Sequence, residues 1–530
     1  VTGVQTCALP ICGKTFQNLN ASHTDNHALW IDPNDGRHVL IGHDGGLEVT
    51  YSGQSPRVTW DKLSNFNVGL FYAVSADMRH PYHVCGGLQD NGSWCGPSAL
   101  RTSGARGGAG GGGGGGPILN QDWIPVGGGD GFYTQNDPSD WAIFYTESQQ
   151  GSMSRYNLRL GTSTSIQPRV GGGGRGGGNV LNAPHAQMYL RFYWNTPILL
   201  SPHSPNTLWF GGNRLFRSDS RGDSYVASPD LTKQVDRCKI TVMGVPGTAA
   251  QLSKNDGLTA YSTIISVSES PVARGTVWAG TDDGNLQVST DNGATFTEVG
   301  KNITGLPSGA LTGDNPYWIA RIEASHFDAK MAYVAIDGHR SDDLKPYVFI
   351  TRDLGKTWQS VAGNLPAYGN LQVIKEDPKN RDLLYAGTEF GLFVSMDAGK
   401  GWEKFMTGYP TVRTDDILVH PRDGDLIVAT HGRSLWIADD ITPLQQWNAQ
   451  VAAADATLFD VRPAVAYLSD IKTDISTGGQ RLFEGENPAR GTAVQFHLKA
   501  GVTGDAKLTI SDLSGRMLCE NTVKAAAGIH

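Results

Sequence analysis

The sequence predicts an all-β fold, a β-propeller of seven or eight blades, because strand and turn patterns recur along most of the chain. The recurring unit is an apolar strand, a turn with Asp-Pro or a similar pair, and a second apolar strand that ends at an anchor position. The eight anchors are Gly42, Gly86, Tyr145, Gly211, Gly280, Ala335, Gly387 and Ala429. They lie 42 to 69 residues apart, which is typical of four-stranded blades with variable loops.

A second pattern is an octapeptide that follows several anchors. Ser289–Phe296 and Thr351–Trp358 fit [S/T]-x-D-x-G-x-T-[W/F], and Ser395–Trp402 departs from it only at Gly401. The aspartate can accept backbone N–H groups across a turn, the glycine tolerates a left-handed conformation, and the aromatic residue can be buried between sheets. We therefore expect three structural turn residues rather than catalysts: Asp291, Asp353 and Asp397.

Composition excludes several other classes of protein. The chain of 530 residues holds 68 glycines, of which ten lie in residues 104–116 and seven in residues 171–178. No Gly-X-Y period of collagen is present, and 13 Trp, 17 Tyr and 17 Phe argue against a disordered chain. No run of 18 apolar residues predicts a membrane span. A net charge of −8 disfavours nucleic acid as a partner.

The octapeptide resembles the Asp box, also called the BNR repeat. Four further segments resemble bacterial sortilin-type (VPS-ten-like) BNR proteins, which are often labelled glycosyl hydrolases: residues 24–33, 45–47, 86–94 and 431–437. The resemblance spans about residues 13–530. It implies a secreted, periplasmic or surface-exposed propeller with a further propeller region upstream, so we expect an extracytoplasmic location.

Three regions are expected along the chain. Residues 1–12 resemble a translated sequencing adapter and are predicted not to be native. Residues 13–445 are predicted to form the propeller, with flexible glycine-rich inserts at 104–116 and 171–178. Residues 446–530 are predicted to be a connector followed by a truncated immunoglobulin- or fibronectin-like sandwich, because short alternating strands begin there and the repeat has ended.

Two cysteines flank a turn-rich segment and can face each other across a hairpin. Cys85 and Cys95 either form a disulfide or are two small buried thiols. No Cys/His cluster with the spacing of a zinc site is present in the sequence.

Propeller strands alternate in direction, so the loops divide between two faces, and the turns that follow the anchors fall on the top face. The carboxylates there are the candidates for paired acid–base catalysis: Asp25, Asp44, Asp90, Asp130 and Glu147. The predicted ligand-binding residues of this face are Arg191, Trp194, Trp318, Arg321 and His431.

The pattern His23-x-Asp25-x-His27 predicts a metal site if these residues lie on one strand. Alternate residues of a strand point to one face, and imidazole and carboxylate groups bind zinc and other divalent ions. The sequence specifies no further ligand, and no other cofactor is expected.

Two functions remain open. The first is a noncatalytic propeller that binds a peptide, protein or glycan on its top face, and the absence of a recognisable catalytic set favours it. The second is a glycoside hydrolase that uses two top-face carboxylates about 5–10 Å apart. Sialidase is disfavoured because no Arg-Ile-Pro segment occurs, and xyloglucanase-type enzymes need two facing propellers where one is expected here. A groove that brings two candidate carboxylates to catalytic spacing would favour the enzyme.

Overall fold

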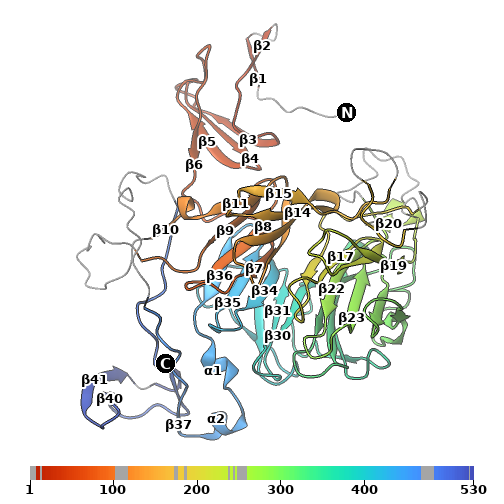
Figure 1. Cartoon of the computed structure of the whole chain (residues 1–530). Coiled ribbons are helices and arrows are strands. Elements are labelled where there is room, and N and C mark those ends of the chain that lie inside the picture. The colour runs from red at the N-terminus through yellow and green to blue at the C-terminus, as the bar shows by residue number, and fades with distance from the viewer. Residues whose placement is uncertain are drawn as a thin grey trace.

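The computed structural model of the protein is almost entirely β-structure, which confirms the predicted fold class (Figure 1). It describes residues 8–11, 15–101, 117–171, 177–183, 188–236, 239–242, 245–246, 260–466, 483–524 and 526–530. The predicted insert at 104–116 lies outside these residues, as does most of the one at 171–178.

Seven antiparallel sheets with strands in chain order follow one another around a ring. The strands of the first three sheets are β7 (Phe71–Ala76), β8 (His83–Leu88), β9 (Gly92–Pro97) and β11 (Ile124–Gly127); β12 (Gly131–Asn136), β13 (Ile143–Ser148), β14 (Ser152–Asn157) and β15 (Thr162–Ser165); β16 (Ile198–Leu200), β17 (Leu208–Gly211), β18 (Arg214–Ser218) and β19 (Val226–Asp230). A hairpin of β20 (Thr241–Val242) and β21 (Val245–Pro246) lies in the connection that follows.

The other four sheets complete the ring, and the last one has three strands. Their strands are β22 (Ile264–Glu269), β23 (Val277–Thr281), β24 (Leu286–Ser289) and β25 (Thr297–Glu298); β26 (Trp318–Ala324), β27 (Ala332–Gly338), β28 (Asp343–Thr351) and β29 (Gln359–Ser360); β30 (Leu371–Glu376), β31 (Leu384–Thr388), β32 (Gly391–Ser395) and β33 (Glu403–Lys404); β34 (Thr414–Val419), β35 (Leu426–Thr430) and β36 (Leu435–Ala438).

The ring closes between its last and first sheets. The first strand of each sheet contacts the first strand of the next, and β34 and β35 contact β7. The Val74 N–H donates to Asp416 Oδ2 at 3.0 Å, and the Tyr82 hydroxyl donates to Asp425 Oδ2 at 2.8 Å. Because no strand is exchanged between these two sheets, side chains and short backbone contacts hold the ring closed.

One four-stranded sheet lies outside the ring, above it in Figure 1, and we call it the outer sheet. It consists of β3 (Asn26–Ile31), β4 (Val39–His43), β5 (Gly46–Thr50) and β6 (Asp61–Leu63). Its first strand is exposed at Leu29, Trp30 and Ile31, whereas the first strands of the ring sheets are mostly buried. The eight anchors therefore divide into seven in the ring and one, Gly42, in the outer sheet.

Short elements complete the chain. Before the outer sheet, β1 (Ala8–Ile11) pairs with β2 (Thr15–Asn18). The elements that follow the ring are α1 (Thr442–Gln445), α2 (Ala449–Ala453), β37 (Ala456–Leu458), β38 (Glu484–Gly485), β39 (Phe496–Leu498), β40 (Asp505–Ser511), β41 (Met517–Lys524) and β42 (Gly528–Ile529). Strands β37, β39 and β42 form one small sheet, β40 and β41 form a hairpin, and β38 pairs with β10 (Ile118–Leu119). Short 3-10 helices are Asn120–Asp122, Gln149–Gly151, Gly300–Asn302 and His339–Ser341.

The three octapeptide aspartates hold turns between the third and fourth strands of their sheets. Asp353 Oδ1 accepts the Thr357 N–H and the Thr351 hydroxyl, both at 2.9 Å. Asp291 and Asp397 accept the equivalent backbone N–H at 2.9 and 2.8 Å. Hydrogen bonds from the Thr295 hydroxyl and the Thr295 backbone N–H lower the pKa of Asp291 to about 2. The aromatic residues that end the last two octapeptides, Trp358 and Trp402, are buried between neighbouring sheets.

The two candidate cysteines form a disulfide. Cys85 on β8 lies directly opposite Cys95 on β9, and both are fully buried. The bond joins the two strands of the hairpin whose turn carries Asp90.

The closure of the ring gives a first prediction. Asp416 accepts the Val74 N–H and pairs with Arg321 at 3.2 Å, and both side chains of the pair are largely buried. We expect Asp416→Ala to lower the free energy of unfolding by about 3 kcal/mol, because the change leaves a buried cation without its carboxylate. Urea unfolding measures this.

The control is Glu520→Ala, which breaks an exposed pair with Lys507 and should change the free energy of unfolding by less than about 1 kcal/mol. Equal effects of the two substitutions would contradict the role given to Asp416.

Candidate functional site

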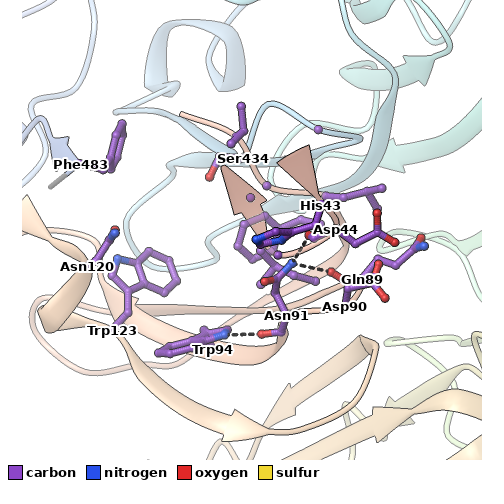
Figure 2. Close-up of a pocket in the computed structure, with 18 of the residues that line it drawn as sticks. His43, Asp44, Gln89, Asp90, Asn91, Trp94, Asn120, Trp123, Ser434 and Phe483 are labelled. Atoms are coloured by element: carbon purple, nitrogen blue, oxygen red, sulfur yellow. Dashed lines mark hydrogen bonds between the residues drawn. The ribbon is translucent and has the colours of Figure 1, made fainter. Parts of the chain in front are cut away.

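A cleft of about 660 Å³ lies between the outer sheet and the first sheet of the ring (Figure 2). The outer sheet and the ring both contribute residues to this cleft. The loop after β35 and one residue of the C-terminal region, Phe483, also line it. The residues labelled in Figure 2 are His43, Asp44, Gln89, Asp90, Asn91, Trp94, Asn120, Trp123, Ser434 and Phe483.

Two tight turns bring acidic side chains to the cleft. Asp44 lies in the turn between β4 and β5 of the outer sheet, and Asp90 lies in the turn between β8 and β9 of the ring. Asp90 has a φ of 60°, in the left-handed region that Asp tolerates better than most residues. Gly92 follows with a φ of 72°, and a Cβ there would lie 2.6 Å from the Gly127 carbonyl oxygen. The turn therefore requires glycine at position 92.

Four of the five predicted carboxylates come together at this place. One oxygen each from Asp25, Asp44 and Asp90 lies within 4.8 Å of the others. Asp130 Oδ1 accepts the Asp90 N–H at 3.0 Å. Burial and, after it, the nearby negative charges of Asp130 and Asp44 together raise the pKa of Asp90 to about 6. The site thus contains an acid that can carry a proton near neutral pH.

The fifth carboxylate, Glu147, lies elsewhere. It is fully buried and accepts the backbone N–H groups of Gly151 and Thr196 at 3.3 and 3.1 Å. Burial raises the pKa of Glu147 well above its usual range. Glu147 therefore has a position inside the ring and not in the cleft.

The predicted set of His23, Asp25 and His27 does not form one ligand group. β3 begins at Asn26, and Asp25 has a left-handed φ of 56°, so the alternation of a strand does not apply. His27 Nε2 instead contacts Asp44 Oδ1 at 2.6 Å, and His23 stacks on His43. Burial lowers the pKa of His43.

Among the described residues, one group of three ligands lies close enough to share a cation: Asp25, Asp44 and Asp90. Carboxylate oxygens suit Ca²⁺ or Mg²⁺ better than the zinc that the histidines suggested.

Two tryptophans form an aromatic side of the cleft (Figure 2). Trp94 on β9 donates its indole N–H to the Asn91 carbonyl oxygen at 2.6 Å, which fixes its ring. Trp123, just before β11, lies against the backbone of β9, where a Cβ at Gly96 would be 2.3 Å from its ring. Rigid aromatic faces beside carboxylates are suited to binding sugar rings, which present apolar C–H faces and polar edges.

The five predicted ligand-binding residues make contacts with other residues of the ring. Arg191 donates to the Ser262 carbonyl oxygen, and Arg321 pairs with Asp416. The other three also have close neighbours: Trp318 lies under the Arg340 guanidinium at 3.7 Å, Trp194 contacts Phe132, and His431 Nδ1 contacts Asp415 Oδ2 at 2.8 Å. His431 comes nearest to the cleft, because Gly432 and Ser434 line it.

Sequence reasoning missed the aromatic residues of the cleft. Trp94 belongs to the segment 86–94 that carried the family resemblance, and its position four residues after Asp90 was a usable signal. Trp123 and Phe483 gave no such signal, because neither belongs to a repeat.

Comparison with known proteins finds a relative in sequence for part of the chain. No family model matches the chain. The chain is 25% identical over 170 residues to an oligoxyloglucan-reducing end-specific xyloglucanase from Emericella nidulans. This stretch covers 31% of the chain and 17% of the relative, so the chain spans a small part of that enzyme's length.

Similar solved structures include the extracellular domain of a hybrid two component system from B. thetaiotaomicron, with a TM-score of 0.44, 12% identity, and coverage of 97% of this chain and 66% of that one. YCF48 from Cyanidioschyzon merolae has a TM-score of 0.42 and 11% identity, and the match covers 70% of this chain and 96% of that one. In the part of the chain that the structure describes, no helix has the length and apolar character needed to cross a membrane.

The raised pKa of Asp90 gives a second prediction. A group whose pKa is higher in the folded than in the unfolded state loses stabilising free energy as the pH rises through that folded pKa. We expect Asp90→Asn to raise the thermal unfolding midpoint at about pH 8, since it removes a disfavoured charge, and to raise it less at about pH 4.5.

Differential scanning fluorimetry of wild type and variant across this range measures the difference. Asp314→Asn, at an exposed position before β26, shows the effect of a charge change alone. A difference between Asp90→Asn and wild type that does not grow between about pH 4 and about pH 8 would contradict the raised pKa.

Proposed function

We propose that the protein binds a glycan chain in the cleft and hydrolyses one of its glycosidic bonds with the carboxylates of that cleft. The observation that carries this proposal is the convergence of Asp25, Asp44 and Asp90 within 4.8 Å beside Trp94 and Trp123. Glycoside hydrolysis needs a carboxylic acid that donates a proton and a carboxylate that acts as nucleophile or base.

Asp90 is the proton donor in this proposal. Its pKa of about 6 leaves a large protonated fraction near neutral pH, as a general acid requires. Asp44, across the cleft on the outer sheet, is the partner carboxylate, and His27 Nε2 at 2.6 Å orients it. The short separation agrees better with the roughly 5–5.5 Å of retaining enzymes than with the roughly 6.5–9.5 Å of inverting ones.

The sequence relative supports the same substrate class. It is named as a xyloglucanase, and its partial match motivates a β-glucan as the first substrate to test. A family assignment to sortilin-type BNR proteins remains a proposal that rests on the segments 24–33, 45–47, 86–94 and 431–437.

A second candidate is a propeller that binds a glycan, peptide or protein without cleaving it. The observation that favours it is the crowding of the carboxylates: three acidic groups within 4.8 Å leave little room for a sugar ring between them unless the outer sheet moves. In that case the tryptophans would supply the affinity and the aspartates the hydrogen bonds to sugar hydroxyls.

We also propose an extracellular, periplasmic or surface location, which the disulfide between Cys85 and Cys95 supports, since such bonds persist in oxidising compartments. The outer sheet is proposed to be one blade of a second propeller. Its first strand exposes Leu29, Trp30 and Ile31, the positions that a neighbouring blade would cover.

The enzyme proposal gives a third prediction. Wild-type protein should release reducing sugars from a soluble β-glucan such as xyloglucan, and kcat/KM should fall as the pH rises above about 6, because Asp90 must be protonated to act. Asp90→Asn should lower kcat at least about 100-fold with binding retained.

Asp314→Asn is the control with an equal change of charge and should keep full activity. Binding of glucan by wild type with no hydrolysis at any pH would favour the noncatalytic candidate. If the wild-type protein neither binds nor hydrolyses any member of a panel of neutral polysaccharides, the glycan proposal is refuted.

A further inference from the structure

A short segment of the C-terminal region lies at the mouth of the cleft. β38 (Glu484–Gly485) pairs antiparallel with β10 (Ile118–Leu119), which belongs to the connection between β9 and β11 of the ring. The Phe483 N–H donates to the Ser64 carbonyl oxygen at 2.9 Å, just after the last strand of the outer sheet. This segment therefore makes hydrogen bonds both to the ring, through β10, and to the residue that follows the outer sheet, Ser64.

A further hydrogen bond fixes the same segment from the ring side. The Leu100 N–H donates to Asn487 Oδ1 at 2.6 Å. Asn120, in the 3-10 helix after β10, donates its amide N–H to the Ser64 carbonyl oxygen at 3.4 Å. Ser64, β10 and β38 thus form one junction, and the position of Phe483 is set by the bond from its own N–H and by the pairing of β38 directly after it.

The Phe483 side chain lines the cleft (Figure 2). In that view Trp94, Trp123 and Phe483 lie to one side, and the carboxylates of Asp44 and Asp90 lie to the other. A ligand that reaches Phe483 from the carboxylates therefore extends toward the side of the cleft on which the two tryptophans lie.

The charges of the lining restrict the ligand further. Asp44 and Asp90 are acidic, with Asp25 and Asp130 beside them. The basic residues that line the cleft are Lys62 and His43, and burial lowers the pKa of His43. A uronate or sulfated glycan would meet like charges at close range, so the lining suits a neutral chain.

We infer that Phe483 is a specificity residue of the cleft, which selects neutral glycan chains long enough to extend from the carboxylates to the aromatic side of the cleft. The inference rests on the proposed function, because it assigns the ligand class and length to that same site. The C-terminal region supplies this sugar platform through β38, and the ring and outer sheet supply the others.

The test measures affinity for cellobiose, cellotetraose and cellohexaose by isothermal titration calorimetry with the full chain. Phe483→Ala should weaken cellohexaose binding about tenfold and leave cellobiose binding unchanged, because the short ligand does not reach position 483. Phe483→Trp should retain wild-type affinity for cellohexaose. Phe390→Ala, at an exposed phenylalanine of a distant blade, is the matched control and should behave like wild type.

The outcomes separate this inference from the proposed function. Wild-type binding of cellohexaose with an unchanged affinity in Phe483→Ala overturns the role of Phe483 and leaves the glycan cleft intact. An equal loss of affinity for all three oligosaccharides in Phe483→Ala also overturns this role, because it indicates that the substitution disturbs the whole cleft. Polygalacturonate bound as tightly as a neutral glucan overturns the restriction to neutral chains. If wild type binds no glycan at all, the proposed function and this inference fail together.

Discussion

Closure of the ring is the constraint on which the remaining structure depends. A seven-sheet ring needs its last sheet to meet its first, and here this happens without exchange of a strand. Asp416 links this seam to a more distant sheet, because its carboxylate accepts the Val74 N–H and also pairs with Arg321 of β26. The turn after β8 and the loop after β35 are thereby held on one face, and Asp90 and Ser434 come to line the same cleft.

The outer sheet and the ring together form the site. Asp25 and Asp44 belong to the outer sheet and the segment before it, whereas Asp90 and Asp130 belong to the ring. Like charges repel at these distances, so hydrogen bonds must hold the bodies together, among them Asn91 Nδ2 to the Asp44 carbonyl oxygen at 3.1 Å. Neither body contains the full set of carboxylates, and the chemistry of the cleft depends on their relative position.

The sequence predicted the strands well because the anchors and the octapeptide turns are local signals. It could not separate Gly42 from the other anchors, because a blade has the same local pattern inside and outside a ring. Asp25 was predicted on a strand, but the chain takes a left-handed turn there. Asp25, Asp44, Asp90 and Asp130 come together at the cleft, whereas Phe483 reaches the cleft through β38 pairing, a long-range contact that no local pattern encodes.

The division of the carboxylates between two bodies links ligand binding to proton exchange. The pKa of Asp90 is raised partly by the charge of Asp44 on the opposite wall. If the outer sheet moves away, that charge recedes, the pKa of Asp90 falls, and a proton leaves for the solvent. If a neutral ligand fills the cleft and excludes water, burial increases and Asp90 takes up a proton. The heat of binding would then vary with the ionisation enthalpy of the buffer. This variation gives the number of protons that the protein exchanges when the cleft opens or closes.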